Sequence, residues 1–182
     1  MLLRGWRRED REPFAALSAD PEAMSHYPAP LTRAESDARV DAYEAEWAQA
    51  GCGKWAVEIP GVAPFAGCIG LGTLTFEASF TPCIEVGWRL APAFWGCGYA
   101  TEGAKAALEF GFRQLGLAEI VAFTIPANTR SLRVMEKLGM SFSGEFDHPM
   151  FADGHRLRKH LLYRIGREGT RMGTPLLPAQ EQ

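Results

Sequence analysis

One segment of the sequence combines residue types that could bind an anion. It reads GWRLAPAFWGCGYATEGAKAALEFGF from Gly87 to Phe112 and predicts a strand, a loop with Pro and Gly, and then a helix. Gly96, Gly98 and the small Ala100 leave the loop amides open, and the helix N-terminus behind them adds unpaired N–H groups and the positive end of a dipole. The segment therefore predicts an anion site suited to phosphate, unless it is a glycine-rich turn without a ligand.

Two common nucleotide sites do not fit this loop. A Walker loop needs G-K-[ST], and a dinucleotide fingerprint needs a third glycine with an acidic residue about 20 positions later; neither pattern is present. ATP hydrolysis and nicotinamide chemistry are therefore disfavoured. A nucleotide-binding switch on the same loop would lack the lysine and the Mg²⁺-ligating hydroxyl that it needs.

Three motifs in order resemble the GNAT superfamily of N-acetyltransferases. The run Trp95-Gly96-Cys97-Gly98-Tyr99-Ala100 is similar to that family's Q/R-x-x-G-x-G/A acetyl-CoA loop, with Trp95 in place of Gln or Arg. The run IEVGWRL before it resembles the family's fourth strand, and the later NTRS and EKLGM resemble its second cofactor segment. The likeness covers about residues 6–163 and points to the branch typified by ribosomal-protein alanine N-acetyltransferases (RimJ/RimL-like).

This resemblance implies acetyl transfer from acetyl-CoA to an amine, without a metal, on a sheet splayed between its fourth and fifth strands. The pantetheine arm would lie in the split and pair with the fourth strand as an added strand does, and the diphosphate would meet the loop amides. Asn128 would hydrogen-bond the arm, although the same side chain could instead cap a helix. The cofactor-binding residues expected on this basis are Trp88, Arg89, Leu90, Trp95, Gly96, Cys97, Gly98, Tyr99, Ala100, Thr101, Asn128 and Ser131.

Two side chains are candidates for the proton transfers. An amine attacks a thioester only when unprotonated, so the site needs a base or a water wire, donors for the oxyanion and an acid for the leaving thiolate. Glu85 alternates with apolar neighbours and could accept the proton, directly or through water, or it could be a solvent-facing residue or half of an ion pair. Ser131 matches the position where this branch carries a hydroxyl near the cofactor sulfur, and it could protonate the thiolate or only help to start a helix.

The remaining reactive side chains are weaker candidates. Cys97 could form an acetyl-cysteine relay, but no adjacent His or Asp would activate its thiol. The basic run HRLRKH, with His155 and His160, predicts a charged, solvated strand face, although it could also attract an acidic acceptor or the 3′-phosphate of the cofactor. The loop residues that could border the acceptor pocket are His26, His148, Glu145 and Asp147.

Capping signals and periodicity predict the elements that position these residues. A polar segment over residues 7–17 predicts a helix, and Thr32 with Glu35 fits a capping box for a second helix that Gly51 ends. The runs KWAVEI, AGCIGLGTLTF and CIEVGWRL then predict an antiparallel meander. After them we expect a helix over 100–115, a strand at LAEIVAFTI, a short helix that Gly139 ends, and strands at MSFSGEF and HRLRKHLLYRI.

This order predicts one α/β (α+β) domain over residues 1–166, with a mixed, mostly antiparallel sheet flanked by helices and a flexible tail at residues 167–182. A length of 182 residues and a hydrophobic fraction of 47% suit a single core, and no apolar run is long enough to span a membrane. The net charge of −3 disfavours nucleic acid as a partner. Four cysteines without C-x-x-C spacing disfavour a metal or disulfide scaffold, and the charged opening is unlike a signal peptide, so we expect a reduced, cytoplasmic protein.

The acceptor is the least determined part of the prediction. Proteins with this scaffold acetylate peptide N-termini, small metabolites, aminoglycoside-like amines or lysine side chains, with pockets made by the first two helices and the late loop, and fold does not determine substrate. Many relatives pair, so a homodimer is a further hypothesis. The alternative function is an acyl-CoA-binding sensor or interaction module without turnover, but the presence of both Glu85 and Ser131 favours the enzyme.

Overall fold

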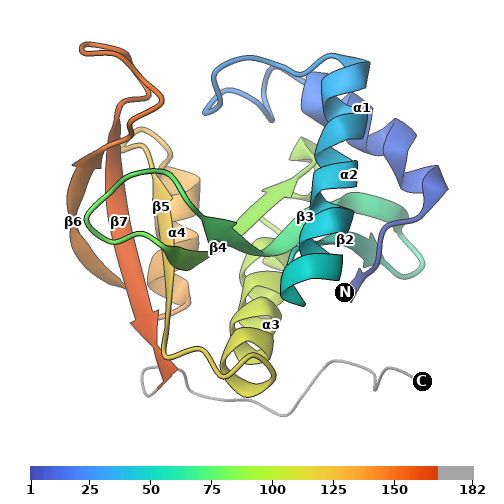
Figure 1. Cartoon of the computed structure of the whole chain (residues 1–182). Coiled ribbons are helices and arrows are strands. Elements are labelled where there is room, and N and C mark those ends of the chain that lie inside the picture. The colour runs from blue at the N-terminus through green and yellow to red at the C-terminus, as the bar shows by residue number, and fades with distance from the viewer. Residues whose placement is uncertain (168–182) are drawn as a thin grey trace.

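The computed structural model describes residues 1–167, in which helices cover both faces of a seven-stranded sheet (Figure 1). The strands are β1 (Leu2–Arg4), β2 (Lys54–Ile59), β3 (Ala63–Leu74), β4 (Cys83–Leu90), β5 (Glu119–Thr124), β6 (Ser141–Asp147) and β7 (Lys159–Gly166). The α-helices are α1 (Arg11–Ala19), α2 (Arg33–Ala50), α3 (Tyr99–Arg113) and α4 (Thr129–Lys137), with short 3₁₀ turns at Arg8–Asp10 and Pro92–Phe94.

The sheet has the order β1-β2-β3-β4-β5-β7-β6, and every neighbouring pair except one is antiparallel. The exception is β4 with β5, which run parallel and pair at one position, Glu85 with Val121. From Val86 to Leu90, β3 is the only described strand that pairs with β4. The predicted α/β domain with a mostly antiparallel sheet is thus confirmed, and its weak seam lies between β4 and β5.

Helix α3 fixes the loop that precedes it by packing closely on the sheet. Its buried face, which includes Ala107 and Leu108, belongs to the main core. Two glycines let the helix approach: a Cβ at Gly103 would lie 2.6 Å from Ile69 Cδ1, and one at Gly111 would lie 2.7 Å from Ile120 Cδ1. Since real Cβ contacts are not that short, any other residue there would require the neighbouring side chains to shift or α3 to move away from the sheet.

Helices α1 and α2 pack on the opposite face through a smaller cluster that includes Phe14, Val40 and Cys68. The predicted capping box is present, since Thr32 Oγ1 accepts from the Glu35 N–H and the Glu35 carboxylate accepts from the Thr32 N–H. Such reciprocal bonds satisfy helix amides that otherwise lack partners. Local signals therefore determine where α2 begins.

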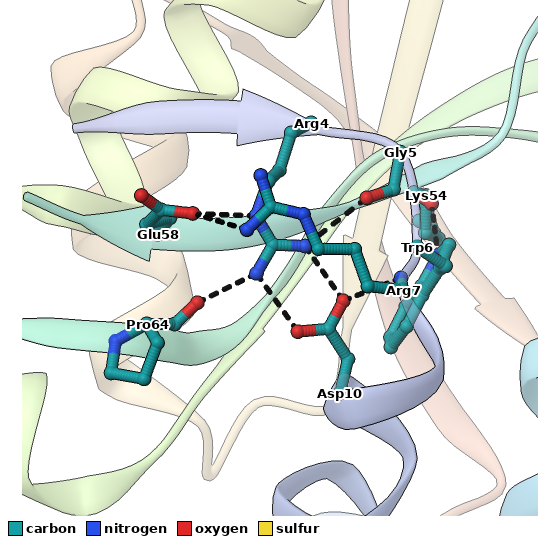
Figure 2. A network of polar contacts seen from close by, with 8 residues as sticks. All are labelled: Arg4, Gly5, Trp6, Arg7, Asp10, Lys54, Glu58 and Pro64. Atoms are coloured by element: carbon teal, nitrogen blue, oxygen red, sulfur yellow. Dashed lines mark hydrogen bonds and ion pairs between the residues drawn. The ribbon is translucent and has the colours of Figure 1, made fainter.

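A polar network ties the start of the chain to the sheet (Figure 2). Arg4 donates to both carboxylate oxygens of Asp10, at 2.6 and 2.8 Å, and its Nε donates to Glu58 at 2.7 Å. Trp6 Nε1 donates to the Lys54 carbonyl at 2.8 Å. The Arg4 and Asp10 side chains are almost fully buried, so this pair holds the following turn against β1, while the contact between Arg4 and Glu58 ties β1 to β2.

Some predicted boundaries were wrong. Strand β1 was not predicted, because three residues carry no periodicity and the pairing partner, β2, is about fifty residues away along the chain. The last strand begins at Lys159, not His155, since residues 155–158 form a turn closed by the Arg158 N–H donating to the His155 carbonyl. Helix α3 spans Tyr99–Arg113 rather than 100–115. Residues 168–182, most of the predicted flexible tail, lie outside the described residues.

Candidate active site

A cavity of about 710 Å³ is lined by the carboxyl-terminal ends of β4 and β5 and by the loops that follow them. That volume is typical of small-molecule sites. Its wall includes most of the predicted site residues, namely Glu85, Trp88, Arg89, Leu90, Trp95, Gly96, Gly98, Ala100, Thr101, Asn128 and Ser131. Cys97 and Tyr99 are not among the lining residues: the Cys97 thiol is exposed and lies 3.5 Å from the Trp95 carbonyl, and the Tyr99 ring packs against Phe94.

The glycine loop has the geometry that an anion site requires. Gly96 and Gly98 have φ values of 77° and 88°, in the left-handed region that side chains disfavour, and the space where their Cβ atoms would lie is open. Gly98 is the N-cap of α3 and provides no side-chain cap, so the first amides of a 15-residue helix are left for another acceptor. The loop therefore fits the diphosphate of a cofactor.

A cation beside this loop was missed by the sequence analysis. The Arg130 guanidinium lies 4.4 Å from the centroid of the Trp95 ring, and Trp95 Nε1 donates to the Leu90 carbonyl at 2.8 Å. Trp95 occupies the first position of the Q/R-x-x-G-x-G/A motif that the loop resembles, and a stacked arginine from α4 supplies positive charge near that position. No signal in the sequence pairs these two residues, because the contact forms only when α4 packs on the sheet.

Asn128 and Ser131 lie at the start of α4 and contact one another. Asn128 Oδ1 accepts from the Ser131 N–H at 3.2 Å, and its Nδ2 donates to Thr124 Oγ1 at 3.0 Å, so the helix-cap interpretation is confirmed. Trp88 Nε1 donates to Ser131 Oγ at 3.3 Å. With its oxygen accepting from the indole, the Ser131 hydroxyl keeps its own hydrogen for donation to a different group.

Glu85 forms an ion pair, one of the alternatives considered for it. Lys54 Nζ lies 3.2 Å from Glu85 Oε1 and 3.1 Å from the Gly70 carbonyl oxygen, and the two side chains are 11% and 24% exposed. Lys54 reaches β4 from β2 by crossing β3, and a Cβ at Gly87 would lie 2.7 Å from its Nζ. Lys54 is a second site residue that the sequence analysis missed.

The opposite wall of the cavity comes from the α1–α2 connection and the β6–β7 loop. Arg156 joins these segments by donating to the Ser25 and Tyr27 carbonyls, at 3.1 Å each. His26, His148 and His160 line this wall, and burial lowers the pKa of each of the three. The expectation of a solvated His160 was wrong: the residue is 8% exposed, because its ring packs among the aromatic side chains of β5 and β6.

The other loop candidates lie elsewhere. Glu145 pairs with Lys159 and Asp147 with Arg158, and neither carboxylate residue lines the cavity. Within residues 1–167 no group of three or more His, Cys, Asp and Glu side chains could hold a metal ion. In the same part of the chain, no helix is both long and apolar enough to cross a membrane.

Comparisons with known proteins agree with this geometry. Residues 1–141 match the family described as "Acetyltransferase (GNAT) domain". The chain is 30% identical over 147 residues to a Bacillus subtilis protein named uncharacterized N-acetyltransferase YnaD, covering 80% of this chain and 82% of the relative. A GNAT-family acetyltransferase structure from Bacillus anthracis is similar with a TM-score of 0.74 and 26% identity, over 91% of this chain and 94% of that one. Mycobacterium smegmatis RimJ, in complex with CoA-disulfide, has a TM-score of 0.73 at 22% identity, over 93% and 83% of the two chains, a likeness of fold.

Proposed function

Because the chain belongs to the GNAT family of acetyltransferases, we propose that it transfers the acetyl group of acetyl-CoA to a primary amine, on a peptide N-terminus or a small molecule. The observation that carries this proposal is the cavity at the β4–β5 seam, whose wall holds both the glycine loop and the Glu85 carboxylate. The three motifs and the fold likeness to RimJ support assignment to the RimJ/RimL-like branch as a narrower hypothesis.

In this proposal the substrate acetyl-CoA is held by backbone groups at two places. Its diphosphate would accept from the amides at the start of α3, beside Arg130, where no side chain caps the helix. Its pantetheine arm would pair with the part of β4 beyond Glu85, from Trp88 to Leu90, which has no ladder with β5. The side-chain amide of Asn128 would keep its capping role, since its oxygen already accepts from Ser131.

The reaction would proceed by direct attack in a ternary complex. The amine nitrogen forms a bond to the thioester carbon, the carbon–sulfur bond breaks, and the amine loses one proton. Glu85 would accept that proton, directly or through water, while Lys54 compensates its negative charge. Ser131 would donate its hydroxyl proton to the leaving thiolate and recover one from solvent. No protein nucleophile is needed, which leaves Cys97 outside the mechanism.

Calorimetric titration with acetyl-CoA tests the binding half of this proposal, with ATP and NAD titrated separately as control ligands. We expect acetyl-CoA binding to weaken at least about tenfold in Gly98→Val, because a β-branched residue strains the left-handed backbone and blocks the amides. Gly61→Val is the matched control: Gly61 has a φ of 74°, its Cβ position is open, and it lies in the β2–β3 turn away from the cavity.

The two halves of the proposal fail in different ways. Folded wild-type protein that does not bind acetyl-CoA would contradict both the acetyltransferase and the sensor. Binding that Gly98→Val abolishes, without thiol release over a broad panel of amines, would support the acyl-CoA sensor and contradict the enzyme. Equal loss of binding in Gly61→Val would show that strain, and not the loop, is responsible.

A further inference from the structure

Arg89 is a buried cation on the cavity wall. It lies on β4, is 9% exposed, and lines the cavity. Its NH1 donates to the Met24 sulfur at 3.1 Å, and its guanidinium lies 4.9 Å from the centroid of the Phe14 ring and 5.2 Å from that of Tyr27. Within the described part of the chain, no carboxylate forms an ion pair with it.

The groups around Arg89 are poor partners for its charge. The sulfur atoms of Met24 and Cys68 are weak acceptors, and the two aromatic rings offer cation–π attraction without satisfying the N–H donors. Burial raises the pKa of Tyr27 and of the nearby Tyr43, so both phenols stay neutral at neutral pH. Burying a charge without an opposite charge is costly, so a bound anion would stabilise this guanidinium more than its two sulfur partners do.

The face on which Arg89 lies separates it from the diphosphate site. Successive residues of a strand point to opposite faces, so Glu85, Gly87 and Arg89 share one face while Trp88 and Leu90 share the other. Leu90 belongs to the core under α3, the helix whose N-terminus closes the glycine loop, and Arg89 contacts Phe14 of α1. Arg89 therefore faces the α1–α2 side of the cavity, together with the proposed base.

We infer that Arg89 binds an anionic group, a carboxylate or a phosphate, of the amine that this protein acetylates. The inference rests on the proposed function and narrows its acceptor to amines that also carry a negative charge. Within the cavity wall, Arg89 then meets the anion while Glu85, four residues earlier on the same face, takes the proton of the amine. Gly87 between them has no side chain, and the Lys54 ammonium that pairs with Glu85 occupies the space where a Cβ of Gly87 would lie.

The charges of this wall favour a zwitterionic acceptor over a polycation. Arg39 and the exposed Glu22 also line the cavity, and the Glu85 carboxylate is already paired with Lys54. Among the described lining residues, Glu22 is therefore the one carboxylate that forms no ion pair. A polyamine would add further positive charge here. A planar guanidinium binds a carboxylate or a phosphate with two parallel hydrogen bonds, so it selects for such groups.

The test measures kcat/KM by thiol release for ω-amino acids from β-alanine to 6-aminohexanoate, each beside its own primary amide. The range is needed because the Cα atoms of residues 85 and 89 are about 13 Å apart in an extended strand. We expect the kcat/KM of at least one acid to exceed that of its amide by about thirtyfold or more. An aminoalkylphosphonate series separates phosphate from carboxylate recognition, and spermidine represents the polycations.

Variants assign the preference to Arg89. Arg89→Met should lower the ratio of kcat/KM between each acid and its amide to about one, and Arg89→Lys should restore part of the preference for the acid. Arg8→Met, which removes an exposed arginine outside the cavity, is the charge-matched control. Calorimetry measures the preference for each acid over its amide without requiring turnover, from the binding of both to the complex with CoA. The affinity of each variant for acetyl-CoA shows that the variant is folded.

The outcomes separate this inference from the proposed function. Turnover of amines with no acid that exceeds its amide, or with spermidine as the best substrate, overturns the inference and leaves the enzyme intact. A preference that survives in Arg89→Met also overturns it, since another group then binds the anion. If no amine is acetylated, the proposed function fails, and binding alone then tests the inference. An acid that binds wild type better than its amide does, and loses this advantage in Arg89→Met, supports the inference. Any other binding result overturns it.

Discussion

Glu85 and Lys54 are the residues that connect the geometry of the site most directly to proton transfer. The Glu85 carboxylate lies on the cavity wall, with one oxygen held by the Lys54 ammonium. Its other oxygen forms no hydrogen bond or ion pair with residues 1–167, and it is free to accept from an amine or a water molecule. An acid–base role and an ion pair, which the sequence left as alternatives, are thus compatible in the same side chain.

We expect Glu85→Gln to lower kcat by about a hundredfold or more, because a positioned general base contributes on that scale. The affinity for acetyl-CoA should stay within about threefold of wild type, since Glu85 lies away from the glycine loop. Single-turnover kinetics and calorimetry measure the two quantities. Glu77→Gln, at an exposed position before the β4 strand, is the isosteric control. A wild-type kcat at saturating substrate in Glu85→Gln would remove this residue from the chemistry.

At the residue scale, local motifs predicted the loop, Glu85, Asn128 and Ser131, which share a cavity in the structure. Lys54 could not be found in this way. It lies 31 residues before Glu85 and reaches it across β3, over the space that Gly87 leaves open. Arg89 was predicted only for its backbone, because the sequence does not show that its guanidinium would be buried without a carboxylate.

At the element scale, the β6–β7 hairpin combines an aromatic cluster with one buried imidazole, His160, and one half-buried imidazole, His148. The His160 ring centroid lies 5.5 Å from that of Phe146, 5.4 Å from Phe123 and 5.2 Å from His148. Burial lowers the pKa of both histidines, and for His160 the proximity of His148 lowers it further. The cluster therefore favours neutral rings, on strands that also line the cavity.

This cluster should make the protein less stable in mild acid. A histidine whose pKa is lower in the folded state binds fewer protons there than in the unfolded state, so stability is full above the unfolded value of about 6.5 and falls as the pH drops below it. We expect His160→Phe to remove much of this decline, which urea unfolding at several pH values between about 5 and 8 would measure. His155→Phe, in the turn before β7, is the control, and an unchanged slope in His160→Phe would contradict the prediction.

Elements with local signals were predicted closely and elements without them were not. The Thr32–Glu35 capping box, Gly51 in the left-handed conformation and Gly139 after α4 act within one or two turns of chain, so the sequence shows them directly. Strand β1 depends on pairing with β2 and on the buried Arg4–Asp10 contact. Alternation through the charged run from residue 155 predicts a strand there, whereas the structure turns at these residues and β7 begins at Lys159.

At the scale of the whole molecule, the β4–β5 seam divides the sheet into two ladders. Strands β1 to β4 form one and β5, β7 and β6 form the other, and the two share the single pair Glu85–Val121 while α3 packs against both (Figure 1). Few backbone hydrogen bonds thus join the two parts, and the proposed pantetheine site lies where these bonds are missing. In this proposal, acetyl-CoA completes a connection that the chain leaves open.

Hydrogen exchange would show this connection directly. Without ligand we expect peptides from β5 to β7 to open at a lower free energy than those from β2 and β3, because a single ladder position joins the second ladder to the first. Acetyl-CoA at about a hundred times its Kd should raise the free energy of opening by about 2.7 kcal/mol for every opening reaction that requires the ligand to dissociate. Exchange in β4, β5 and the start of α3 should therefore slow by about a hundredfold, and the difference between the two ladders should shrink. Gly98→Val at the same ligand concentration is the control; a uniform opening free energy before ligand is added would contradict the division of the sheet.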